Sequence, residues 1–407
     1  MRIFAALFFL FGVIDLSAQN TWEKKESFGT DKRSRAVSFS VGNRGYIGCG
    51  EDTADQVRND LWEYDPGTDS WMQRASLPGA ARRDAVGLAI GNKGYVGTGI
   101  NAAESAFGTN LNDWWEYSPA TNTWTQKATY PGSTSYGGIY FGCGFVINGM
   151  GYIVGGKQSN SNYTSALWQY DPTTNIWTQK TSFAGGTRYA MSAFVVNGIA
   201  YAGLGTDEDI LQTSWWSYNP ITNAWTQKNN FPGTGRFAAA GFAIGTKGYI
   251  VGGSDGGYKD ELWQYDPVSD TWWTKAPFGG GERRSLSVFV IANAAYAGCG
   301  SGFTGKRRDL WQYEQFVTDV EETQTLVINT FPNPTTDFIQ LSAPPQTGVF
   351  PSDCILSITT INGKLVRELE VSGERIIQLS TEEFASGQYI VTTLAPNWNA
   401  QTKFIKR

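Results

Sequence analysis

The 407-residue sequence contains no histidine and only four cysteines. Without an imidazole, the chain cannot form a Ser-His-Asp triad, a Cys-His dyad or the His-rich zinc and copper sites of most metalloenzymes. Four cysteines are too few for a disulfide scaffold in a chain of this length, so burial of apolar side chains must hold the fold. We therefore expect no metal and no cofactor, and any catalysis would depend on carboxylates, Tyr, Lys, Arg or Cys.

The chain also lacks an excess of positive charge. Its 32 Lys and Arg against 37 Asp and Glu give a formal net charge of −5, and phosphate binding needs a concentrated basic surface, so no nucleic acid is expected as a partner. A single packed core rarely exceeds roughly 250 to 300 residues, so this length predicts two domains or a repeat array. The 48 glycines and 14% aromatic residues indicate many turns between aromatic-rich strands.

The first residues are typical of a secretory signal peptide. Arg2 precedes an apolar run over residues 3–14, and small Ser17 and Ala18 follow, which predicts a leader of residues 1–18 that is cut after Ala18. As a helix, the apolar run would span only about 18 Å, short of the roughly 30 Å hydrocarbon core, so it is too short for a membrane anchor. Elsewhere apolar runs are shorter than twenty residues, so we expect no transmembrane segment in the mature chain.

A Trp-x-Tyr motif recurs at intervals of about 50 residues, the period expected of a β-propeller. Its six copies begin at Trp62, Trp115, Trp168, Trp216, Trp263 and Trp311. Each copy follows a strand that starts with Tyr and runs into glycines, and the first five copies are followed by a second Trp. Alternation and turn residues predict four strands per unit, which in the fifth unit are residues 237–244, 248–252, 261–265 and 271–276.

The missing second Trp of the sixth copy predicts how the ring closes. Trp22 precedes Tyr46 by the same distance as the second Trp of most units precedes the next glycine-strand Tyr. Residues 21–25 are therefore expected to form the outer strand of the last blade. Such closure removes open sheet edges, which otherwise promote aggregation.

The Gly-Gly pairs, the Trp-x-Tyr-Asp-Pro turns and the later Trp resemble kelch repeats, as in the central domain of the galactose oxidase superfamily. The resemblance implies an all-β, six-bladed kelch-type β-propeller over residues 19–315. It says less about function, because kelch propellers include oxidases, sugar mutarotases and binding scaffolds. Galactose oxidases hold copper with Tyr and His, and since this chain has no His, copper oxidase chemistry does not carry over.

The C-terminal part differs from the repeats. An acidic linker at 316–325 precedes alternating segments over 326–407, which predict a small antiparallel β-sandwich. Its motifs closely resemble the type A C-terminal sorting domain of the type IX secretion system. They lie at Pro332, Asn333, Pro334, Gly363, Gly387 and Tyr389. The resemblance implies the type IX machinery as a partner, with passage through the periplasm to the medium or the outer-membrane surface of a Bacteroidetes-type bacterium. The alternative is an ordinary immunoglobulin-like module.

Five units carry an arginine at the same distance before the glycine-strand Tyr. These are Arg33, Arg82, Arg188, Arg236 and Arg283, and the third unit has Ile139 instead. Repeat symmetry predicts them around one mouth of the central channel, on the face that carries the variable loops, where binding sites usually lie. Two interpretations remain open: ion pairs with carboxylates such as Asp60 and Asp113, or contact with an anionic or glycan ligand. On the loops, Phe107, Tyr163 and Tyr258 are candidate stacking residues.

Two classes of function fit this pattern, and neither identifies a catalytic residue. The first is a secreted binding module for a glycan or protein ligand, expected to be a monomer. The alternative is a sugar-modifying enzyme resembling a sialic-acid mutarotase, in which Arg holds a carboxylate and an acid moves the proton. That chemistry needs an acid beside Arg188 or Arg236, and the inner strands carry none. Whether Cys49 and Cys299, at equivalent positions of touching blades, are bonded stays open.

Overall fold

The computed structural model describes residues 21–29, 31–104, 106–132, 137–159, 162–207, 210–314, 329–343, 349–350, 354–361, 364–395 and 398–407. Within these ranges the chain forms strands and turns without a helix, so it offers no helix that could cross a membrane. The chain divides into two compact units, with Gln19–Gln315 in one and Phe316–Arg407 in the other. The predicted leader, the linker at 316–325 and Gly363 lie outside the described residues.

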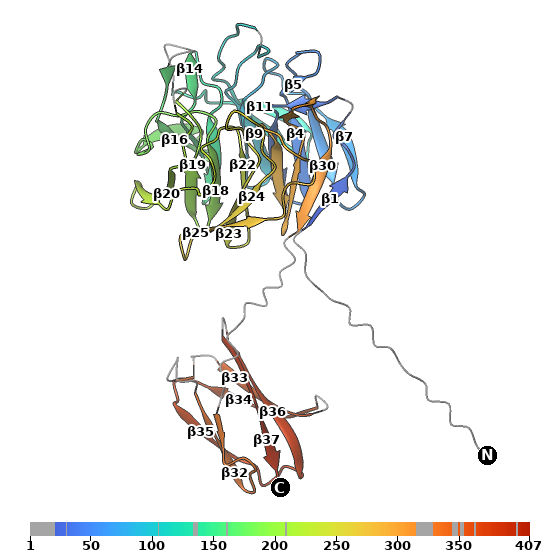
Figure 1. Cartoon of the computed structure of the whole chain (residues 1–407), viewed down its shortest axis with the longest axis vertical. Coiled ribbons are helices and arrows are strands. Elements are labelled where there is room, and N and C mark those ends of the chain that lie inside the picture. Colours follow the sequence, from blue (N-terminus) through green and yellow to red (C-terminus); the bar gives the residue numbers. More distant parts are fainter. Residues whose placement is uncertain are drawn as a thin grey trace, which may run out of the picture. The chain divides into compact units, whose positions relative to one another are not determined.

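Six four-stranded antiparallel sheets build the first unit (Figure 1). From inner to outer strand they are β3 (Val37–Val41), β4 (Arg44–Gly48), β6 (Leu61–Asp65) and β7 (Ser70–Arg74); β8 (Val86–Ile90), β9 (Lys93–Gly97), β10 (Trp114–Ser118) and β11 (Thr123–Lys127); β12 (Cys143–Ile147), β13 (Met150–Val154), β16 (Leu167–Asp171) and β17 (Ile176–Lys180); β18 (Ser192–Val196), β19 (Ile199–Gly203), β20 (Trp215–Asn219) and β21 (Ala224–Lys228); β22 (Ala240–Ile244), β23 (Lys247–Val251), β24 (Leu262–Asp266) and β25 (Thr271–Lys275); and β26 (Ser287–Ile291), β27 (Ala294–Gly298), β30 (Leu310–Glu314) and β1 (Thr21–Lys25). The inner strands contact one another in a closed cycle, β3–β8–β12–β18–β22–β26 and back to β3. The unit is a six-bladed β-propeller.

The sixth blade takes its outer strand from the start of the repeat region. β1 pairs with β30 in antiparallel register, which places Trp22 opposite Tyr313. The Trp22 ring contacts Phe278 edge-on at 4.8 Å and Tyr313 at 5.1 Å, and its Nε1 donates to the carbonyl of Ala276. The N-terminal strand thus closes the ring through both main-chain pairing and aromatic packing.

Glycines on the second strands let neighbouring blades approach closely. A Cβ at Gly45 would lie 2.1 Å from the ring of Phe289 on the preceding blade, and one at Gly94 would lie 2.3 Å from Phe39. Each Phe therefore fills the space that a larger residue would occupy. This explains why the glycines fall inside strands, where they otherwise weaken pairing.

Three two-stranded sheets lie on the face that carries the loops between second and third strands. They pair β2 (Arg33–Ser34) with β5 (Glu51–Asp52), β14 (Lys157–Ser159) with β15 (Asn162–Tyr163), and β28 (Ser301–Gly302) with β29 (Gly305–Lys306). β1 begins and β30 ends at the opposite face, because Thr21 pairs with Glu314 there. The loop face is therefore free of both chain ends of the propeller.

The inner strand of the fifth blade is shorter than the sequence suggests. It begins at Ala240 rather than at residue 237, because Ala238 has a φ of +53°, a left-handed conformation that interrupts an extended strand. The residues before the strand instead form part of the rim around the propeller axis.

The second unit is a small antiparallel sandwich. One sheet has the order β31 (Asn329–Phe331), β32 (Phe338–Ser342), β35 (Ile376–Ser380), and the other β34 (Leu365–Val371), β33 (Cys354–Thr360), β36 (Gly387–Ala395), β37 (Trp398–Lys406). Side chains from both sheets, including Ile339, Leu356, Val391 and Phe404, form one buried core. Alternation of apolar and polar residues produces these one-sided sheets.

The residues of the Pro-Asn-Pro motif bind the end of the chain. The Asn333 side chain donates to the carbonyl of Lys403 at 3.0 Å and accepts from the amide of Ile405 at 2.9 Å. Pro332 and Pro334 flank it, and the Asn333–Pro334 peptide is cis. Gly387, the first residue of β36, pairs with Lys406, and the Tyr389 hydroxyl donates to the carbonyl of Ala385 at 2.7 Å.

Cys49, Cys143 and Cys299 are buried free thiols, and Cys354 is also buried. Burial raises the pKa of Cys49 and of Cys299 to about 12, which keeps these thiols protonated at neutral pH. The equivalent positions of Cys49 and Cys299 therefore hold two unlinked side chains.

Candidate binding site at the mouth of the propeller axis

The five repeat arginines lie inside the blades, with exposed fractions between 0% and 4%. Arg82 shows the arrangement: its Nη1 and Nη2 donate to Asp113 at 2.6 and 2.7 Å, and Nη1 also donates to the carbonyl of Thr98. The same Asp113 carboxylate accepts the Nε1 hydrogen of Trp115 at 2.7 Å. One carboxylate thus links the arginine, which precedes the inner strand, to the Trp of the third strand.

Three further blades repeat this bracing. The guanidinium–carboxylate pairs are Arg33–Asp60, Arg236–Glu261 and Arg283–Asp309. Each of these carboxylates also accepts a Trp Nε1 hydrogen. Buried charges need such paired partners because burial removes their hydration.

Blades three and four depart from the pattern. Blade three has Ile139 and Ala166 in place of the Arg and the acid, so both charges are missing together. Blade four keeps Arg188 but has Ser214 in the acid position. Burial lowers the pKa of Arg188 to about 10, with Asp207 acting in the opposite direction.

This geometry favours ion pairing over ligand contact for four of the repeat arginines. The guanidinium groups of Arg33, Arg82, Arg236 and Arg283 pair with the acid two residues before the third-strand Trp of their own blade. Arg188 bonds carbonyl groups instead. The sequence pattern predicts all five around the channel mouth, but none of them is among the residues that line the pocket at the mouth of the axis.

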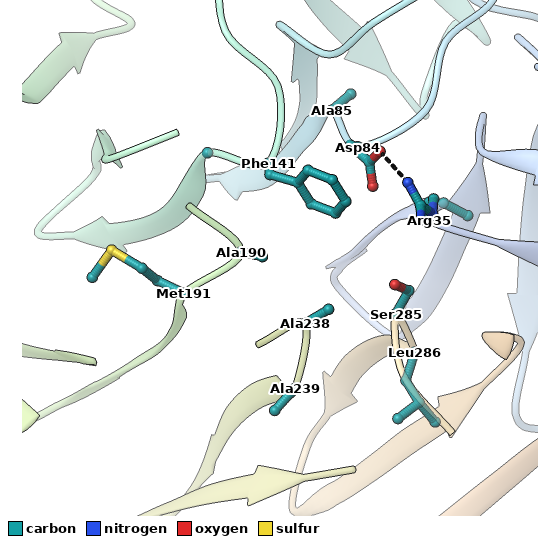
Figure 2. Close-up of a pocket in the computed structure, with 12 residues that line it drawn as sticks. Arg35, Asp84, Ala85, Phe141, Ala190, Met191, Ala238, Ala239, Ser285 and Leu286 are labelled. Atoms are coloured by element: carbon teal, nitrogen blue, oxygen red, sulfur yellow. Dashed lines mark hydrogen bonds and ion pairs between the residues drawn. The ribbon is translucent and has the colours of Figure 1, made fainter. Parts of the chain in front are cut away.

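The mouth of the axis is a pocket of about 140 Å³ to which every blade contributes two consecutive residues (Figure 2). The first member of each pair is Arg35, Asp84, Phe141, Ala190, Ala238 or Ser285. All six have φ between +51° and +57°. Their second members are Ala36, Ala85, Gly142, Met191, Ala239 and Leu286.

Main-chain hydrogen bonds hold this rim rigid. From Asp84 round to Ser285, each amide of the first members donates to the carbonyl of the first member in the preceding blade, at 2.9 to 3.1 Å. Non-glycine residues with positive φ are strained, and such residues concentrate at functional sites. The rim is thus a rigid main-chain frame whose side chains differ from blade to blade.

The pocket is polar on one side and apolar on the other. Arg35 donates to the Asp84 carboxylate at 3.2 Å, and Ser285 adds a hydroxyl. Phe141 points toward this ion pair from the opposite side (Figure 2), with the Arg35 guanidinium 5.2 Å from the centre of its ring. Ala190, which lacks any side-chain polar atom, continues the apolar side.

The protonation of the pocket depends on burial and on charge. Burial raises the pKa of the Asp84 carboxyl above its usual value, although Arg35 and Arg83 act against it. Burial alone would lower the pKa of Arg35, but the charges of Asp84, Glu104 and Glu51 outweigh it and the pKa is raised. The pocket therefore holds a cation beside a carboxyl that gains a proton more readily than an exposed Asp.

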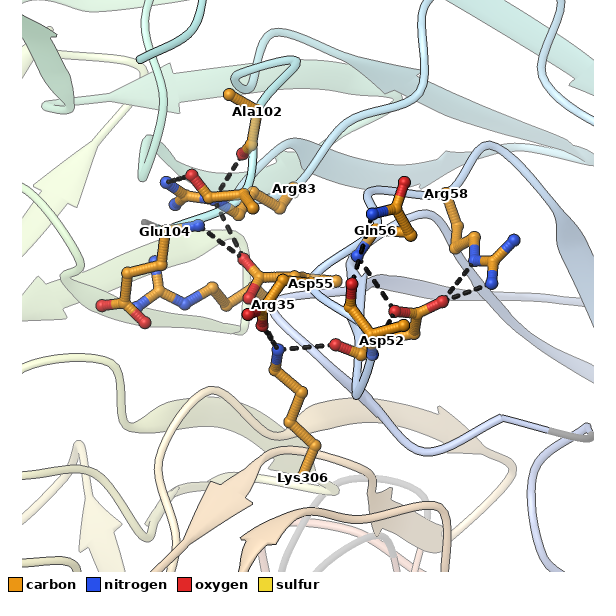
Figure 3. Close-up of polar contacts among 12 residues, drawn as sticks. Arg35, Asp52, Asp55, Gln56, Arg58, Arg83, Ala102, Glu104 and Lys306 are labelled. Atoms are coloured by element: carbon orange, nitrogen blue, oxygen red, sulfur yellow. Dashed lines mark hydrogen bonds and ion pairs between the residues drawn. The ribbon is translucent and has the colours of Figure 1, made fainter. Parts of the chain in front are cut away.

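A network of ion pairs supports the polar side (Figure 3). The buried carboxylate of Glu51 accepts from Lys306 of blade six at 2.6 Å and lies 3.3 Å from Arg83 of blade two. Glu104 pairs with Arg35 and lies 3.6 Å from Arg284. Loops from blades one, two and six are thus linked, which orders the charged part of the loop face.

Beneath the pocket lies a channel cavity of about 480 Å³. Its walls come from the inner strands and carry small or apolar side chains such as Gly144, Ala193 and Val290; the hydroxyls of Ser38 and Ser40 are the polar side-chain groups among its lining residues. The lining contains no ionisable group. Of the two axial cavities, the mouth is therefore the one whose lining carries charged side chains.

The predicted stacking residues lie on separate loops. Phe107 is 98% exposed. Tyr163 stacks on Tyr189 at 5.2 Å, and Tyr258 meets Phe303 edge-on at 4.9 Å. They surround the loop face as separate aromatic contacts rather than one platform.

Arg35 and Asp84 are the functional candidates that sequence reasoning missed. They follow the repeat arginine position by two residues, where the six blades carry five different residue types and only alanine occurs twice. A search for repeated residues passes over such a position because no residue type is common to most blades. The available signal is its constant distance from the glycine-strand Tyr.

Comparison with known proteins agrees with this geometry. Residues 145–183 and 235–277 match the Kelch motif, and residues 329–407 match the secretion system C-terminal sorting domain. The chain is a kelch propeller with a type IX sorting domain. A solved structure titled "Structure of YjhT" resembles it with a TM-score of 0.62 at 16% identity, over 72% of this chain and 98% of that chain. No curated protein matches the chain.

The sorting domain of this kelch propeller implies handling by the type IX machinery and export to the medium or the cell surface. The likeness to the solved structure concerns the fold alone. The loop face and the axial pocket are therefore the features of the kelch propeller that bear on its role after export.

Proposed function

We propose that this protein is an exported binding protein whose loop face recognises a glycan, with one sugar ring entering the axial pocket. The observation that carries the proposal is the two-sided pocket. A sugar ring has an apolar C–H face and a polar edge of hydroxyls, and binding sites for such ligands combine aromatic contact with a few fixed polar groups. Phe141 supplies the first, and Arg35, Asp84 and Ser285 supply the second.

The size of the pocket supports one ring rather than a longer segment. A cavity of roughly 150 Å³ admits a molecule the size of benzene, and the axial pocket measures about 140 Å³. The remainder of a glycan would lie across the loops, where Tyr258 and the exposed Phe107 offer aromatic surface. The alternative ligand is a protein that contacts the same loops and inserts no group into the pocket.

A glycan array probed with the full exported chain tests the proposal. Asp84→Asn keeps the shape of the side chain but removes its charge, and Phe141→Ala removes the ring. Asp84→Asn is expected to weaken binding about 10-fold or more, because hydrogen bonds to a charged group contribute about 1.5 to 3 kcal/mol. Phe141→Ala is expected to weaken binding because the apolar face of the sugar ring loses its aromatic contact. Glu23→Gln, on the outer strand β1, is the matched control and should bind like the parent.

The result that would overturn the glycan proposal is a parent protein without array signal, or pocket variants that bind as the parent does. Binding of a protein ligand that survives both Asp84→Asn and Phe141→Ala would assign recognition to the outer loops instead. Melting temperatures of the variants show whether any loss comes from unfolding.

A second candidate is a sugar-modifying enzyme resembling a sialic-acid mutarotase. The Arg35–Asp84 pair favours it, because Arg can hold a carboxylate and a carboxyl of raised pKa can transfer a proton. The Asp84 side chain is only 2% exposed, so either a bound sugar ring or a substrate would have to displace part of the rim to reach it. Exchange between anomers of free sialic acid, followed by NMR, decides: acceleration that Asp84→Asn abolishes would support the enzyme.

We further propose that a cleaved leader takes the chain to the periplasm and that the sorting domain then takes it across the outer membrane. Deletion of residues 326–407 in the native host should leave the propeller in the periplasm. Unchanged levels at the surface and in the medium would refute this route. Asn333→Ala, which removes the side chain that binds the C-terminal strand at Lys403 and Ile405, should lower export without touching the propeller.

A further inference from the structure

We infer that blade four contains a small-anion site, at the position where four other blades hold a carboxylate. In those blades the acid two residues before the third-strand Trp accepts hydrogens from both the repeat arginine and that Trp. The backbone frame of the repeat therefore shapes a place for negatively charged oxygens between these two donors.

Blade four keeps the donors and lacks the acceptor. Arg188 is 4% exposed, and its guanidinium bonds two carbonyls, those of Gly185 and Leu204. The Trp216 Nε1 and the Ser214 Oγ are buried polar atoms that have no hydrogen-bond partner among the described residues. Ser214 stands where Asp113 stands in blade two, so repeat symmetry places three donor groups around the position that the carboxylate takes there.

A neutral molecule leaves the charge of this site unbalanced. Burying a cation without a paired anion is costly, and burial lowers the pKa of Arg188. A monovalent anion that replaces the missing carboxylate satisfies all three donors at once and pairs the guanidinium charge. Its size must match a carboxylate head, because Phe183 covers the other side of the guanidinium at 5.1 Å. Halides meet both requirements.

The equivalent position borders solvent in two other blades. There the carboxylate side chains of Asp60 and Glu261 are 19% and 42% exposed. Blade three provides an internal comparison, because Trp168 Nε1 also lacks a hydrogen-bond partner among the described residues but Ile139 replaces the cation.

Crystals of the protein soaked in bromide test the site directly by anomalous scattering at the bromine edge. The expected result is a peak within hydrogen-bond distance of Arg188, Ser214 and Trp216, with none at Trp168. A peak at both blades would show that the Trp donor alone suffices and would overturn the role of the cation. An ordered water at blade four, or no peak there, would overturn the inference.

In solution, replacement of gluconate by bromide at constant ionic strength should raise the melting temperature of the parent by about 2 °C or more relative to Ser214→Asp. Ser214→Asp restores the repeat's own carboxylate and should remove the part of the rise in melting temperature that depends on bromide. The reciprocal Asp309→Ser in blade six creates the same vacancy beside Arg283 and should add a second bromide peak. This reciprocal variant decides the question if Ser214→Asp does not fold, and its failure to gain a peak would refute the inference.

Discussion

Removal of one bracing carboxylate should destabilise the propeller more than removal of the whole ion pair. In Asp113→Ala, the buried Arg82 loses bonds of 2.6 and 2.7 Å and Trp115 loses its acceptor. Arg82 then keeps only the carbonyls of Ala80 and Thr98. Breaking a buried pair by removing one partner costs about 3 to 5 kcal/mol, and since the Asp113 side chain is 19% exposed, we expect the lower end, about 3 kcal/mol.

The double variant Arg82→Ile, Asp113→Ala copies what blade three already contains at Ile139 and Ala166. Replacement of a buried ion pair by apolar residues is often neutral, and the unsatisfied Trp115 Nε1 adds about 1 kcal/mol. The free energy of unfolding should therefore fall by about 1 kcal/mol in the double variant, less than in Asp113→Ala alone.

Urea titration followed by Trp fluorescence gives these free energies, because all but one of the 16 Trp belong to the propeller repeats and their closing strand. The single variant Arg82→Ile completes the double-mutant cycle. The reasoning is refuted if the double variant is as unstable as Asp113→Ala, or if Asp113→Ala costs less than about 1 kcal/mol.

Three further predictions concern closure, packing and pH. Trp22→Ala should lower the free energy of unfolding by about 2 to 3 kcal/mol, since Trp-to-Ala changes cost about 3 to 5 kcal/mol when fully buried and Trp22 is half-buried; urea titration measures it, with Lys24→Ala as control. In the same assay Gly94→Ala should cost about 2 kcal/mol or more, because the new Cβ would lie 2.3 Å from Phe39, and a near-zero change would contradict the packing argument. Burial alone would raise the pKa of Asp113, but Arg82 outweighs it and the pKa is lowered. The ionised Asp113 therefore stabilises the fold above the unfolded pKa of about 4, and this stabilisation is lost as pH falls through the folded pKa. The melting temperature should accordingly fall below about pH 4.

The blade pattern was readable from the sequence because its residues repeat for structural reasons. In blade five the predicted segment 261–265 overlaps β24 and the predicted segment 271–276 overlaps β25, each within one residue. The phase of Trp22 predicted a closing strand at 21–25, and β1 occupies those residues. Alternation, turn residues and repeat distance all act locally, so one sequence suffices to find them.

The site was less predictable for the same reason. The repeated arginines attract attention, yet the property that repeats is their ion pair with a carboxylate of the same blade. The rim residues, such as Asp84 and Phe141, share a left-handed φ and differ in chemistry. Their conformation follows from main-chain bonds to the preceding blade, which no local pattern reveals. In blade five this conformation also shortened the predicted inner strand at Ala238.

Closure of the ring by β1 sets the order in which the protein can be completed. Trp22 and Tyr313 are about 290 residues apart in sequence. Such distant pairings form late, because the entropy cost of closing the long loop comes before the energy gained from the contacts. During synthesis β1 stays unpaired until β30 has been made, and the sorting domain is made only after that. A chain truncated within the repeats therefore has neither a closed ring nor a sorting domain. Every chain that carries the sorting domain also contains both β1 and β30, the two strands that close the ring.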